Sequence, residues 1–407
     1  MQKILLVSGT RPEVIKLAPL YHALREQAWA APFWLHTAER GAARQVFGIF
    51  GLQPDVTLDP HTLTRKFSLD CRRQLEARMH SEPWSAVVVQ GDSESAFLGA
   101  LAAYYHQIPV AHVEAGLRTY NLGRPLISRL GRFHFAPNER ARDLLLAEGV
   151  LPEHIHLTGD TVVDAQQWVT QRYGIRRQTS GRGHLLVSIH RGENKGPALA
   201  EICLAIGDIA QQKAGLDVLV HCELPARERR TLAGMLGRMA HVKLAPPPDY
   251  LGTQQSLADA WAVLTDSTGL REEAPHYGVP VLTLRSDADR HEAADGPDNG
   301  GAVNVSPRRA DIARAVLELL QDPERHARLK EQRNPFGEGG AAMRMAGILE
   351  QHLGAVESDR PARREWSDSA AHHEEPAPQP HLRDATEFPS PPREAALRRT
   401  RGAAVAR

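Results

Sequence analysis

Two acidic residues stand close to the ends of apolar segments in the first half of the chain. Asp92 follows the segment 85–89, and Glu114 closes the segment 109–114. If these segments are parallel strands, both side chains lie where open α/β sheets bind ligands. A carboxylate in such a site can accept or return a proton. An acid at a strand end can instead cap a helix or form an ion pair, so the residues alone leave both roles open.

A second candidate group follows the apolar segment 184–189. His190 and Arg191 come directly after it, with Glu193 and Asn194 close behind. Histidine exchanges protons near neutral pH, and the flanking charged and amide side chains favour a functional role for His190. The chain has 20 histidines, and a hydrogen-bonded core histidine is the alternative interpretation of His190.

The segment 263–284 is predicted to form a strand, a turn, a helix over 270–277 and a second strand. Its turn contains small residues with donor groups: Ser267, Thr268 and Gly269. Free N–H groups at a helix N-terminus attract anions, while Glu272 and Glu273 lie one turn further on and suit the diol of a ribose. The segment is therefore suited to hold a nucleotide by its diphosphate and sugar, but the residues alone do not select this role. An ordinary βαβ unit with a capped helix would show the same pattern.

Apolar strands and amphipathic helices alternate around these candidates. In the first half we predict strands at 3–8, 33–36, 85–89, 109–114 and 133–137, with helices from Pro12, over 42–50 and 94–105, and up to Leu146. After a hinge near 162–174, we predict strands at 184–189, 217–221, 242–244, 262–264 and 279–282, and helices over 199–213, 228–238, 254–261, 270–277, 312–320, 323–332 and 341–353. The alternation predicts an α/β protein with doubly wound parallel sheets.

The composition of the 407 residues limits the possible functions. Lys+Arg and Asp+Glu both number 49, so the charge balance does not indicate binding to nucleic acid or to a membrane surface. Cys71, Cys203 and Cys222 have no CxxC spacing, which favours a reducing compartment and argues against a zinc site. No apolar run approaches the roughly 20 residues that cross a bilayer. We therefore expect a cytoplasmic protein without membrane insertion.

The composition changes near residue 356. Pro, Ala, Arg, Glu and His dominate residues 356–407, with little periodicity and few large apolar side chains. Such a segment cannot bury enough apolar surface to fold alone, so we predict a disordered tail. The remainder of the chain is long enough for two ordinary domains.

Seven motifs occur in one order: GTRPEVIKLAPL from Gly9, QGDSES from Gln90, HVEAGLR from His112, TGDTVVDA from Thr158, IHRGENKG from Ile189, TDSTGLREEAP from Thr265 and RSDADRHEA from Arg285. Together they resemble the non-hydrolysing UDP-N-acetylglucosamine 2-epimerases of bacteria over roughly residues 1–354. Each motif alone is weakly specific, whereas seven in order are strongly specific for the family.

The resemblance implies a GT-B-like fold in which two Rossmann-like domains face each other across a cleft. It divides the chain into two domains. Residues 1–165 carry the carboxylates and are completed by the helix 341–354, and residues 166–340 bind UDP. The implied reaction interconverts UDP-N-acetylglucosamine and UDP-N-acetylmannosamine, a precursor of surface polysaccharides. UDP is eliminated to leave a 2-acetamidoglucal and is then added back. The resemblance implies a homodimer and no metal or other cofactor.

The resemblance also assigns roles to residues. Asp92 and Glu114 correspond to acid/base residues, and His190 to the residue that stabilises the departing UDP. The substrate-binding residues that it implies are Arg11, Arg191, His221, Ser267, Thr268, Gly269, Glu273, Arg285 and Arg290. For Arg11, a surface ion pair is the alternative.

The chain departs from the family pattern at several places, of which two bear on function most. The segment 117–129 contains no Asp or Glu, whereas the family has a catalytic glutamate there. Glu39 and Arg40 replace the Gln-His pair of a region that helps to bind a second, activating UDP-N-acetylglucosamine. Three other functions therefore stay open: a hydrolysing 2-epimerase that releases UDP and N-acetylmannosamine, a UDP-sugar-binding homologue with impaired catalysis, and a GT-B glycosyltransferase.

Overall fold

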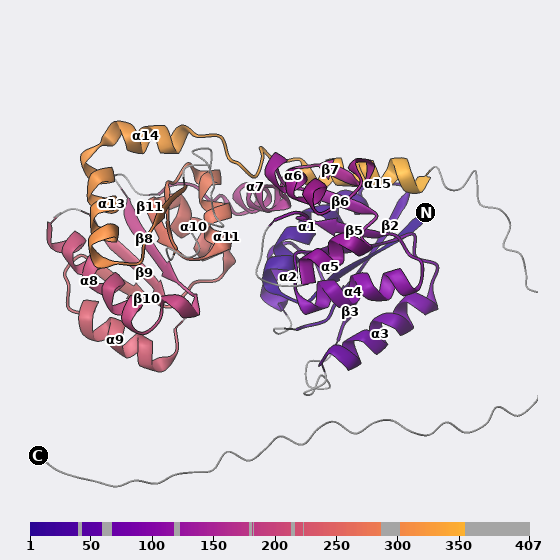
Figure 1. Ribbon diagram of the computed structural model, residues 1–407, viewed down its shortest axis with the longest axis horizontal. Coiled ribbons are helices and arrows are strands. Elements are labelled where there is room, and N and C mark those ends of the chain that lie inside the picture. Colours follow the sequence, from indigo (N-terminus) through magenta and orange to yellow (C-terminus); the bar gives the residue numbers. More distant parts are fainter. Residues whose placement is uncertain are drawn as a thin grey trace, which may run out of the picture. The chain divides into compact units, whose positions relative to one another are not determined.

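The computed structural model describes residues 1–39, 43–58, 67–117, 123–178, 181, 183–212, 216–222, 224–285 and 302–354. Two separate β-sheets organise this part of the chain, each lying between layers of helices (Figure 1). The strand orders are β3-β2-β1-β4-β5-β6-β7 and β10-β9-β8-β11-β12-β13. Every registered strand pair in them is parallel. The predicted fold class, α/β with two doubly wound parallel sheets, is confirmed.

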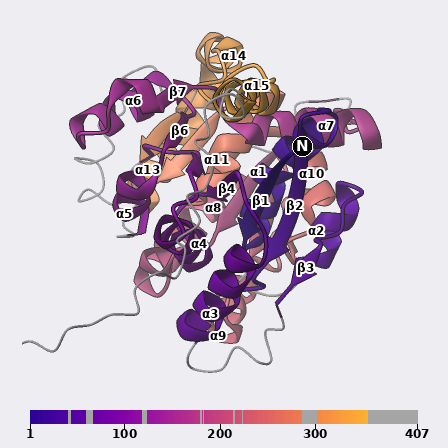
Figure 2. The ribbon, with the colours of Figure 1, turned by 90° about the vertical axis from the view of Figure 1, so that its right-hand side faces the viewer.

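The first sheet contains β1 (Gln2–Ser8), β2 (Ala30–His36), β3 (Val56–Thr57), β4 (Ala86–Gln90), β5 (Val110–Val113), β6 (Phe133–Ala136) and β7 (Ile155–Leu157). Figure 2 shows β4, β1, β2 and β3 in this spatial order. Its helices are α1 (Arg11–Arg25), α2 (Arg44–Ile49), α3 (Phe67–Ser81), α4 (Glu94–Tyr105), α5 (Gly123–Leu130) and α6 (Glu139–Ala147). The sequence pattern misses β3, α3, α5 and β7.

The second sheet contains β8 (His184–Ile189), β9 (Val218–Cys222), β10 (Val242–Ala245), β11 (Ala260–Thr265), β12 (Val281–Leu284) and β13 (Ala302–Val305). Its helices are α8 (Pro197–Gln212), α9 (Ala226–Leu236), α10 (Tyr250–Asp259), α11 (Thr268–Glu273), α13 (Arg309–Gln321) and α14 (Pro323–Glu331). Short 3-10 turns are η1 (Pro152–His154), η2 (Gly192–Asn194) and η3 (Ala274–Tyr277). The linking helix is α7 (Thr161–Tyr173), and the last helix is α15 (Ala341–Gly354).

The apolar strands are continuous because both faces of each sheet are covered. Along β1, Ile4 and Leu6 belong to one core cluster with residues of α1, α7 and α15. The alternate residues Leu5 and Val7 belong to another cluster with residues of α3 and α4. The strand ends are therefore the parts of the sheet that remain open to a ligand.

Three details differ from the sequence predictions. The helix predicted over 254–261 ends at Asp259, and Trp261 lies on β11, where its ring stacks on His326 at 4.9 Å. In the predicted hinge region 162–174, the helix expected around Trp168 is present as α7, and it extends over the whole region and ends at Gly174 with a φ of 66°. The helix predicted over 270–277 consists of α11 followed by η3. Apolar side chains fit either secondary structure at such boundaries, so periodicity alone does not separate them.

Helix α15 packs against the first sheet's helices. Met345 and Leu349 are fully buried in the cluster that contains Ile4 and Leu6. Asp164 of α7 accepts hydrogen bonds from the N–H groups of Ala341 and Ala342 at 3.2 and 3.1 Å, which satisfies donors at the start of α15. The domain limits predicted at 1–165, 166–340 and 341–354 stay a prediction. The predicted boundary between residues 165 and 166 falls inside α7. Within the described ranges, no helix combines the length and apolarity that a membrane span needs.

We predict that Leu349→Ala lowers the free energy of unfolding by about 2–5 kcal/mol, because it removes buried methyl groups and leaves a cavity. Urea titration followed by circular dichroism measures the loss. Glu350→Ala on the same helix is the control, since Glu350 is exposed. Equal stability of the two variants would show that α15 does not pack on the first sheet.

Candidate active site

Glu114 occupies a strained position directly after β5. Its φ of 62° lies in the left-handed region, which costs a non-glycine residue free energy. Its side chain is buried, and the Gln90 amide donates a hydrogen bond to its Oε2 atom. The Nζ atom of Lys16 lies 3.0 Å from the same oxygen. The ion-pair role that the sequence left open for this acid is therefore present in the structure.

Lys16, on α1, is surrounded by carboxylates from three other elements. Besides Glu114, its Nζ atom lies 2.7 Å from Glu272 of α11 and 3.5 Å from Asp160, which caps α7. We call these four residues the Lys16 cluster. All four are buried. The cluster joins Glu114, which follows β5 of the first sheet, to α11, which follows β11 of the second sheet. Helix α11 begins at the turn that was predicted to bind a diphosphate.

Burial and mutual charge shift the pKa values in the Lys16 cluster. Burial opposes the charge of Lys16, but Asp160, Glu114 and Glu272 outweigh it and hold the pKa of the ammonium well above its ordinary value. Burial raises the pKa of Glu272 to about 7 although Lys16 opposes this, and the Glu114 and Asp160 charges raise it further. Burial also raises the pKa of Asp160. The cluster therefore favours a charged lysine, and Glu272 and Asp160 bind a proton more readily than exposed acids do.

The Lys16 cluster also has the only carboxylate arrangement in the described ranges that could hold a metal ion. One oxygen each of Glu114, Asp160 and Glu272 lie within 4.8 Å of one another. The Lys16 ammonium already contacts oxygens of all three groups and supplies their positive partner. We therefore interpret the triad as an ion-pair cluster.

Asp92 lies in the turn after β4, beside the end of β5. The N–H of Gly91 donates to the carbonyl of Val113 at 3.2 Å, and His112 Nε2 lies 2.8 Å from the Gly91 carbonyl oxygen. Asp92 itself is half-buried, and within the described part of the chain its carboxylate has no hydrogen-bond or ion-pair partner. Asp92 and Glu114 thus follow neighbouring strands. The Asp92 carboxylate has no such partner within the described residues, whereas the Glu114 carboxylate contacts Lys16 and Gln90.

Another buried acid, Glu13, lies near this turn, and its role was not predicted from the sequence. Its Oε2 atom accepts hydrogen bonds from the N–H groups of Gly9 and Thr10 at 2.5 and 3.0 Å. Burial raises its pKa to about 7, against the effect of the Ser93 hydroxyl and these N–H groups. Glu13 fixes the turn before α1. Arg11 is the first residue of this helix and is exposed. The capping box S/T-x-x-E, here from Thr10 to Glu13, was its signal in the sequence.

His190 and Arg191 are held by the buried carboxylate of Asp266. Its two oxygens accept the N–H of His190 at 2.8 Å and the N–H of Arg191 at 3.0 Å. The Asn194 amide donates to the same group at 2.8 Å. The His190 ring makes a 2.8 Å hydrogen bond with the hydroxyl of Ser188. The loop after β8 is therefore fixed, and this positioning role of Asp266 was not predicted.

The guanidinium of Arg191 extends to the turn predicted to bind diphosphate. Its Nη2 atom donates to the Thr268 hydroxyl at 3.3 Å, and its Nε atom donates to the Asp266 carbonyl at 2.9 Å. Ser267 is the N-cap of α11 and accepts the N–H of Leu270 at 3.4 Å. Thr268 and its neighbour Gly269 are exposed. The structure thus brings Arg191 together with the turn 267–269.

His221 lies beside this loop, because β8 and β9 pair Ser188 with His221. Burial lowers the pKa of His221 to about 4, and the neighbouring His184 and His190 lower it further. His221 is therefore neutral near pH 7, so it can offer a hydrogen bond but not a positive charge.

Glu273 is the residue of α11 that was assigned to ribose. The Gln254 amide donates to its Oε2 atom at 2.6 Å, and Gln166 of α7 donates to its carbonyl at 2.9 Å. Burial raises the pKa of Glu273 to about 7, against the Gln254 hydrogen bond, and the Glu272 charge raises it further. This carboxylate changes charge near neutral pH.

The remaining assigned residues are partly described. Arg285 follows β12, is half-buried and donates its N–H to the Val305 carbonyl at 3.0 Å. Arg290 lies outside the described residues, as do Arg40 and the tail 356–407. Glu39 accepts hydrogen bonds from the N–H and the hydroxyl of Ser95 at 3.0 and 2.6 Å. Part of the segment 117–129 is also outside, and α5 occupies its second half.

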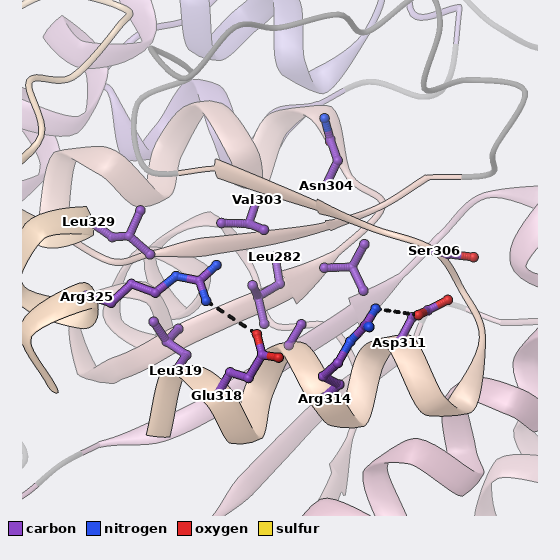
Figure 3. Close-up of a pocket in the computed structure, with 12 residues that line it drawn as sticks. Leu282, Val303, Asn304, Ser306, Asp311, Arg314, Glu318, Leu319, Arg325 and Leu329 are labelled. Atoms are coloured by element: carbon purple, nitrogen blue, oxygen red, sulfur yellow. Dashed lines mark hydrogen bonds and ion pairs between the residues drawn. The ribbon is translucent and has the colours of Figure 1, made fainter. Parts of the chain in front are cut away.

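A cavity of about 320 Å³ lies elsewhere, between β13, α13 and α14 (Figure 3). Arg314 pairs with Asp311 at 2.7 Å and Arg325 with Glu318 at 3.4 Å along its wall. None of its lining residues belongs to the groups described above. The chemistry-bearing residues therefore gather at the strand ends and not in this cavity.

The sequence and the fold match one family of known proteins. The sequence model of the UDP-N-acetylglucosamine 2-epimerases matches residues 22–350. The UDP-N-acetylglucosamine 2-epimerase of Yersinia pestis is 34% identical over 376 residues, which cover 86% of this chain and 99% of that protein. The Escherichia coli K12 enzyme of the same name is 33% identical over 375 residues, which cover 86% of this chain and 99% of that protein.

Solved structures agree with this likeness. The UDP-GlcNAc 2-epimerase of Neisseria meningitidis bound to UDP-GlcNAc has a TM-score of 0.75 and 30% identity, covering 86% of this chain and 100% of that one. The S. aureus MnaA–UDP co-structure has a TM-score of 0.77 and 29% identity, covering 89% of this chain and 99% of that one. The chain therefore belongs to the UDP-N-acetylglucosamine 2-epimerase family, as the seven motifs imply.

Proposed function

We propose that this protein is a non-hydrolysing UDP-N-acetylglucosamine 2-epimerase, which interconverts UDP-N-acetylglucosamine and UDP-N-acetylmannosamine. The observation that supports this most is the position of Lys16, 3.0 Å from Glu114 and 2.7 Å from Glu272. Glu114 is the proposed proton-transfer group, and Glu272 lies on the helix that follows the proposed diphosphate turn. A reaction at a sugar carbon next to a diphosphate needs both kinds of group in one place.

The proposed reaction breaks the C2–H bond and the C1–O bond of the sugar. The proton passes to a carboxylate, the C2–H electron pair forms the C1=C2 bond of the 2-acetamidoglucal, and the C1–O electron pair leaves with UDP. Re-addition reverses these changes with a proton delivered to the other face of C2. Of Asp92 and Glu114, one accepts the proton from C2 and the other returns a proton to C2. The diphosphate is stabilised by His190, Arg191 and Arg11.

Substrate binding is proposed at the second sheet. Ser267, Thr268 and Gly269 with Arg191 receive the diphosphate, and Glu273 receives the ribose hydroxyls. His221, Arg285 and Arg290 complete the set. The metabolic role in surface-polysaccharide supply, the homodimer and the cytoplasmic location are further parts of the proposal, carried over from the family resemblance and from the cysteine content of the chain.

The absence of Asp and Glu from the segment 117–129 favours one alternative, a UDP-sugar-binding homologue with impaired catalysis. Incubation with UDP-N-acetylglucosamine in D₂O, followed by NMR, separates the candidate functions. The proposal predicts deuterium at C2 of both nucleotide sugars and no net release of UDP. Irreversible release of UDP identifies a hydrolysing enzyme. Thermal stabilisation by UDP without any exchange at C2 identifies the binding protein and contradicts the proposal.

We predict that Asp92→Asn lowers kcat by about 10²–10⁴-fold, because the amide cannot accept the C2 proton. Steady-state production of UDP-N-acetylmannosamine measures the effect. Asp143→Asn on α6 is the control, since Asp143 is exposed and pairs only with the adjacent Arg142 within the described residues. A kcat for Asp92→Asn within a few-fold of the control would remove Asp92 from the mechanism.

The raised pKa of Glu273, about 7, predicts a pH-dependent affinity for UDP. The ribose hydroxyls donate to the ionised carboxylate, so affinity should rise as pH increases through 7, and Glu273→Gln should remove this rise. The phosphates of UDP titrate equally in both proteins, so the difference between them isolates Glu273. We expect a difference of about 10-fold at pH 8, measured by calorimetry, for one charge-assisted hydrogen bond. Parallel affinity curves for the two proteins would exclude this contact.

A further inference from the structure

Gln254 is a buried amide in contact with the proposed ribose ligand. It lies on α10, is fully buried, and its Nε2 atom donates to Oε2 of Glu273 at 2.6 Å. A buried amide needs hydrogen-bond partners for both its oxygen and its nitrogen, whereas an apolar side chain would fill the same space without that requirement. The presence of an amide at this position therefore needs an explanation.

We propose that Gln254 is a positioning residue for nucleotide binding: its amide holds one oxygen of the Glu273 carboxylate, so that the other oxygen faces the turn 267–269 and accepts a hydroxyl of the ribose. This inference rests on the function proposed above. It adds a residue of α10 to a site that the strand ends and α11 otherwise form.

The direction of the Gln254 amide follows from its neighbours. The backbone carbonyl of Glu273 can only accept, so the side-chain nitrogen of Gln166, which lies 2.9 Å away, must donate to it. The same Gln166 nitrogen lies 2.9 Å from Gln254 Oε1, and the Tyr277 hydroxyl donates to that oxygen at 2.9 Å. Because the oxygen of Gln254 meets these two donors, its nitrogen faces the Glu273 carboxylate.

The Glu273 carboxylate is held in one orientation by this contact. Its Oε2 atom is fixed by Gln254, whereas no protein group among the described residues hydrogen-bonds to its Oε1 atom. A Cβ atom placed on Gly269 would lie 4.0 Å from this Oε1 and 3.9 Å from the Ser267 hydroxyl, so Oε1 lies beside the proposed diphosphate turn. A half-buried carboxylate that is held on one side and open on the other suits a ligand hydroxyl next to that turn.

The charged groups around Glu273 act in opposite directions. Burial raises the pKa of Glu273 to about 7, and the Gln254 hydrogen bond is the strongest of the effects that lower it. Glu272 raises this pKa further, and Lys16 of α1 lowers it. Two phenols also face the carboxylate, and burial raises their pKa values, so both are neutral at pH 7: Tyr250 of α10 and Tyr277 of η3. The amide therefore favours the ionised carboxylate, which is the form that accepts hydroxyl groups.

Gln254→Met and Gln254→Glu test the proposal. Methionine keeps the length of the side chain and removes both polar groups. Glutamate keeps an acceptor for Gln166 and Tyr277, so the inner hydrogen bonds survive, but it places a second carboxyl group against Glu273 in place of the donor. Calorimetry at pH 7 should show that both variants bind UDP about 10-fold more weakly, because Glu273 loses one charge-assisted hydrogen bond that fixes it.

Turnover should show the same effect in KM. We expect KM for UDP-N-acetylglucosamine to rise by a similar factor in both Gln254 variants, while kcat changes by less than about threefold. The reason is that the diphosphate separates the ribose from the sugar carbon that reacts.

A double-mutant cycle with Glu273→Gln separates positioning from a structural defect. If Gln254 acts through the Glu273 carboxylate, Gln254→Met should weaken UDP binding by less than about twofold once Glu273→Gln is present. A structural defect in α10 or α11 would lower the affinity by the same factor in both backgrounds. The pH profile gives a second readout, because loss of the amide raises the pKa of Glu273 and should move the rise in UDP affinity to higher pH by about one unit.

Gln255→Met is the matched control. Gln255 is the next residue of α10, and its amide donates to the Arg176 carbonyl and to the Asp259 carboxylate at 2.9 Å each, without a contact to Glu273 in the described structure. Its affinity for UDP should equal that of the wild type at every pH.

The outcomes separate this inference from the proposed function, since UDP affinity is measured without turnover. If Glu273→Gln weakens UDP binding while both Gln254 variants bind UDP like the wild type, the inference is wrong and the epimerase function stands. Equal losses for Gln254→Met in both backgrounds reduce Gln254 to a structural residue and also overturn the inference. An unchanged affinity in Glu273→Gln excludes the ribose contact and the role of Gln254 with it. A wild type that does not bind UDP contradicts the proposed function itself.

Discussion

A buried ion-pair cluster around Lys16 connects the elements that carry the candidate site. The ammonium of Lys16 is buried among carboxylates from the end of β5, the start of α7 and the helix α11. Burial alone would remove the charge of a lysine, and here three acids outweigh that effect. The same contact joins the half of the chain that carries Asp92 and Glu114 to the half that carries the His190 loop. Both the fold and the chemistry are constrained by it.

A second buried acid, Asp266, plays a comparable part in the second sheet. It binds the N–H groups of His190 and Arg191 and the amide of Asn194, so the loop after β8 has a fixed conformation. The side chains that would meet a substrate, such as Arg191 and Thr268, extend from this fixed frame. Sites supported in this way keep their geometry when charge develops during a reaction.

The strand ends were the part of the site that could be predicted from sequence. Asp92 and Glu114 follow apolar runs of the first sheet and His190 follows one of the second, and parallel strands bring the residues after them to the carboxyl edge of each sheet. The parallel sheets themselves followed from the alternation of apolar strands and amphipathic helices. Trp261 was assigned to a helix and lies on a strand, because a short apolar run fits both periods.

The buried contacts of Lys16 and Asp160 could not be predicted from the sequence. Their contacts join residues that are 144 and 256 positions apart, and periodicity within one helix carries no information about such partners. A lysine inside the apolar run VIKLAPL was the one local signal, since a helix face that buries its neighbours buries it as well. The left-handed backbone of Glu114 is likewise invisible in the sequence, where nothing distinguishes it from any other strand-end acid.

Under the proposed function, the Lys16 cluster brings the proton-transfer group Glu114 and the diphosphate turn 267–269 to one place. A crystal structure of the protein with UDP and 2-acetamidoglucal tests it most directly. We expect C2 of the glycal to lie about 3–3.5 Å from a carboxylate oxygen of Glu114, with the diphosphate bound to Arg191 and Thr268. A glycal remote from Glu114, or a diphosphate bound away from the turn 267–269, would contradict it.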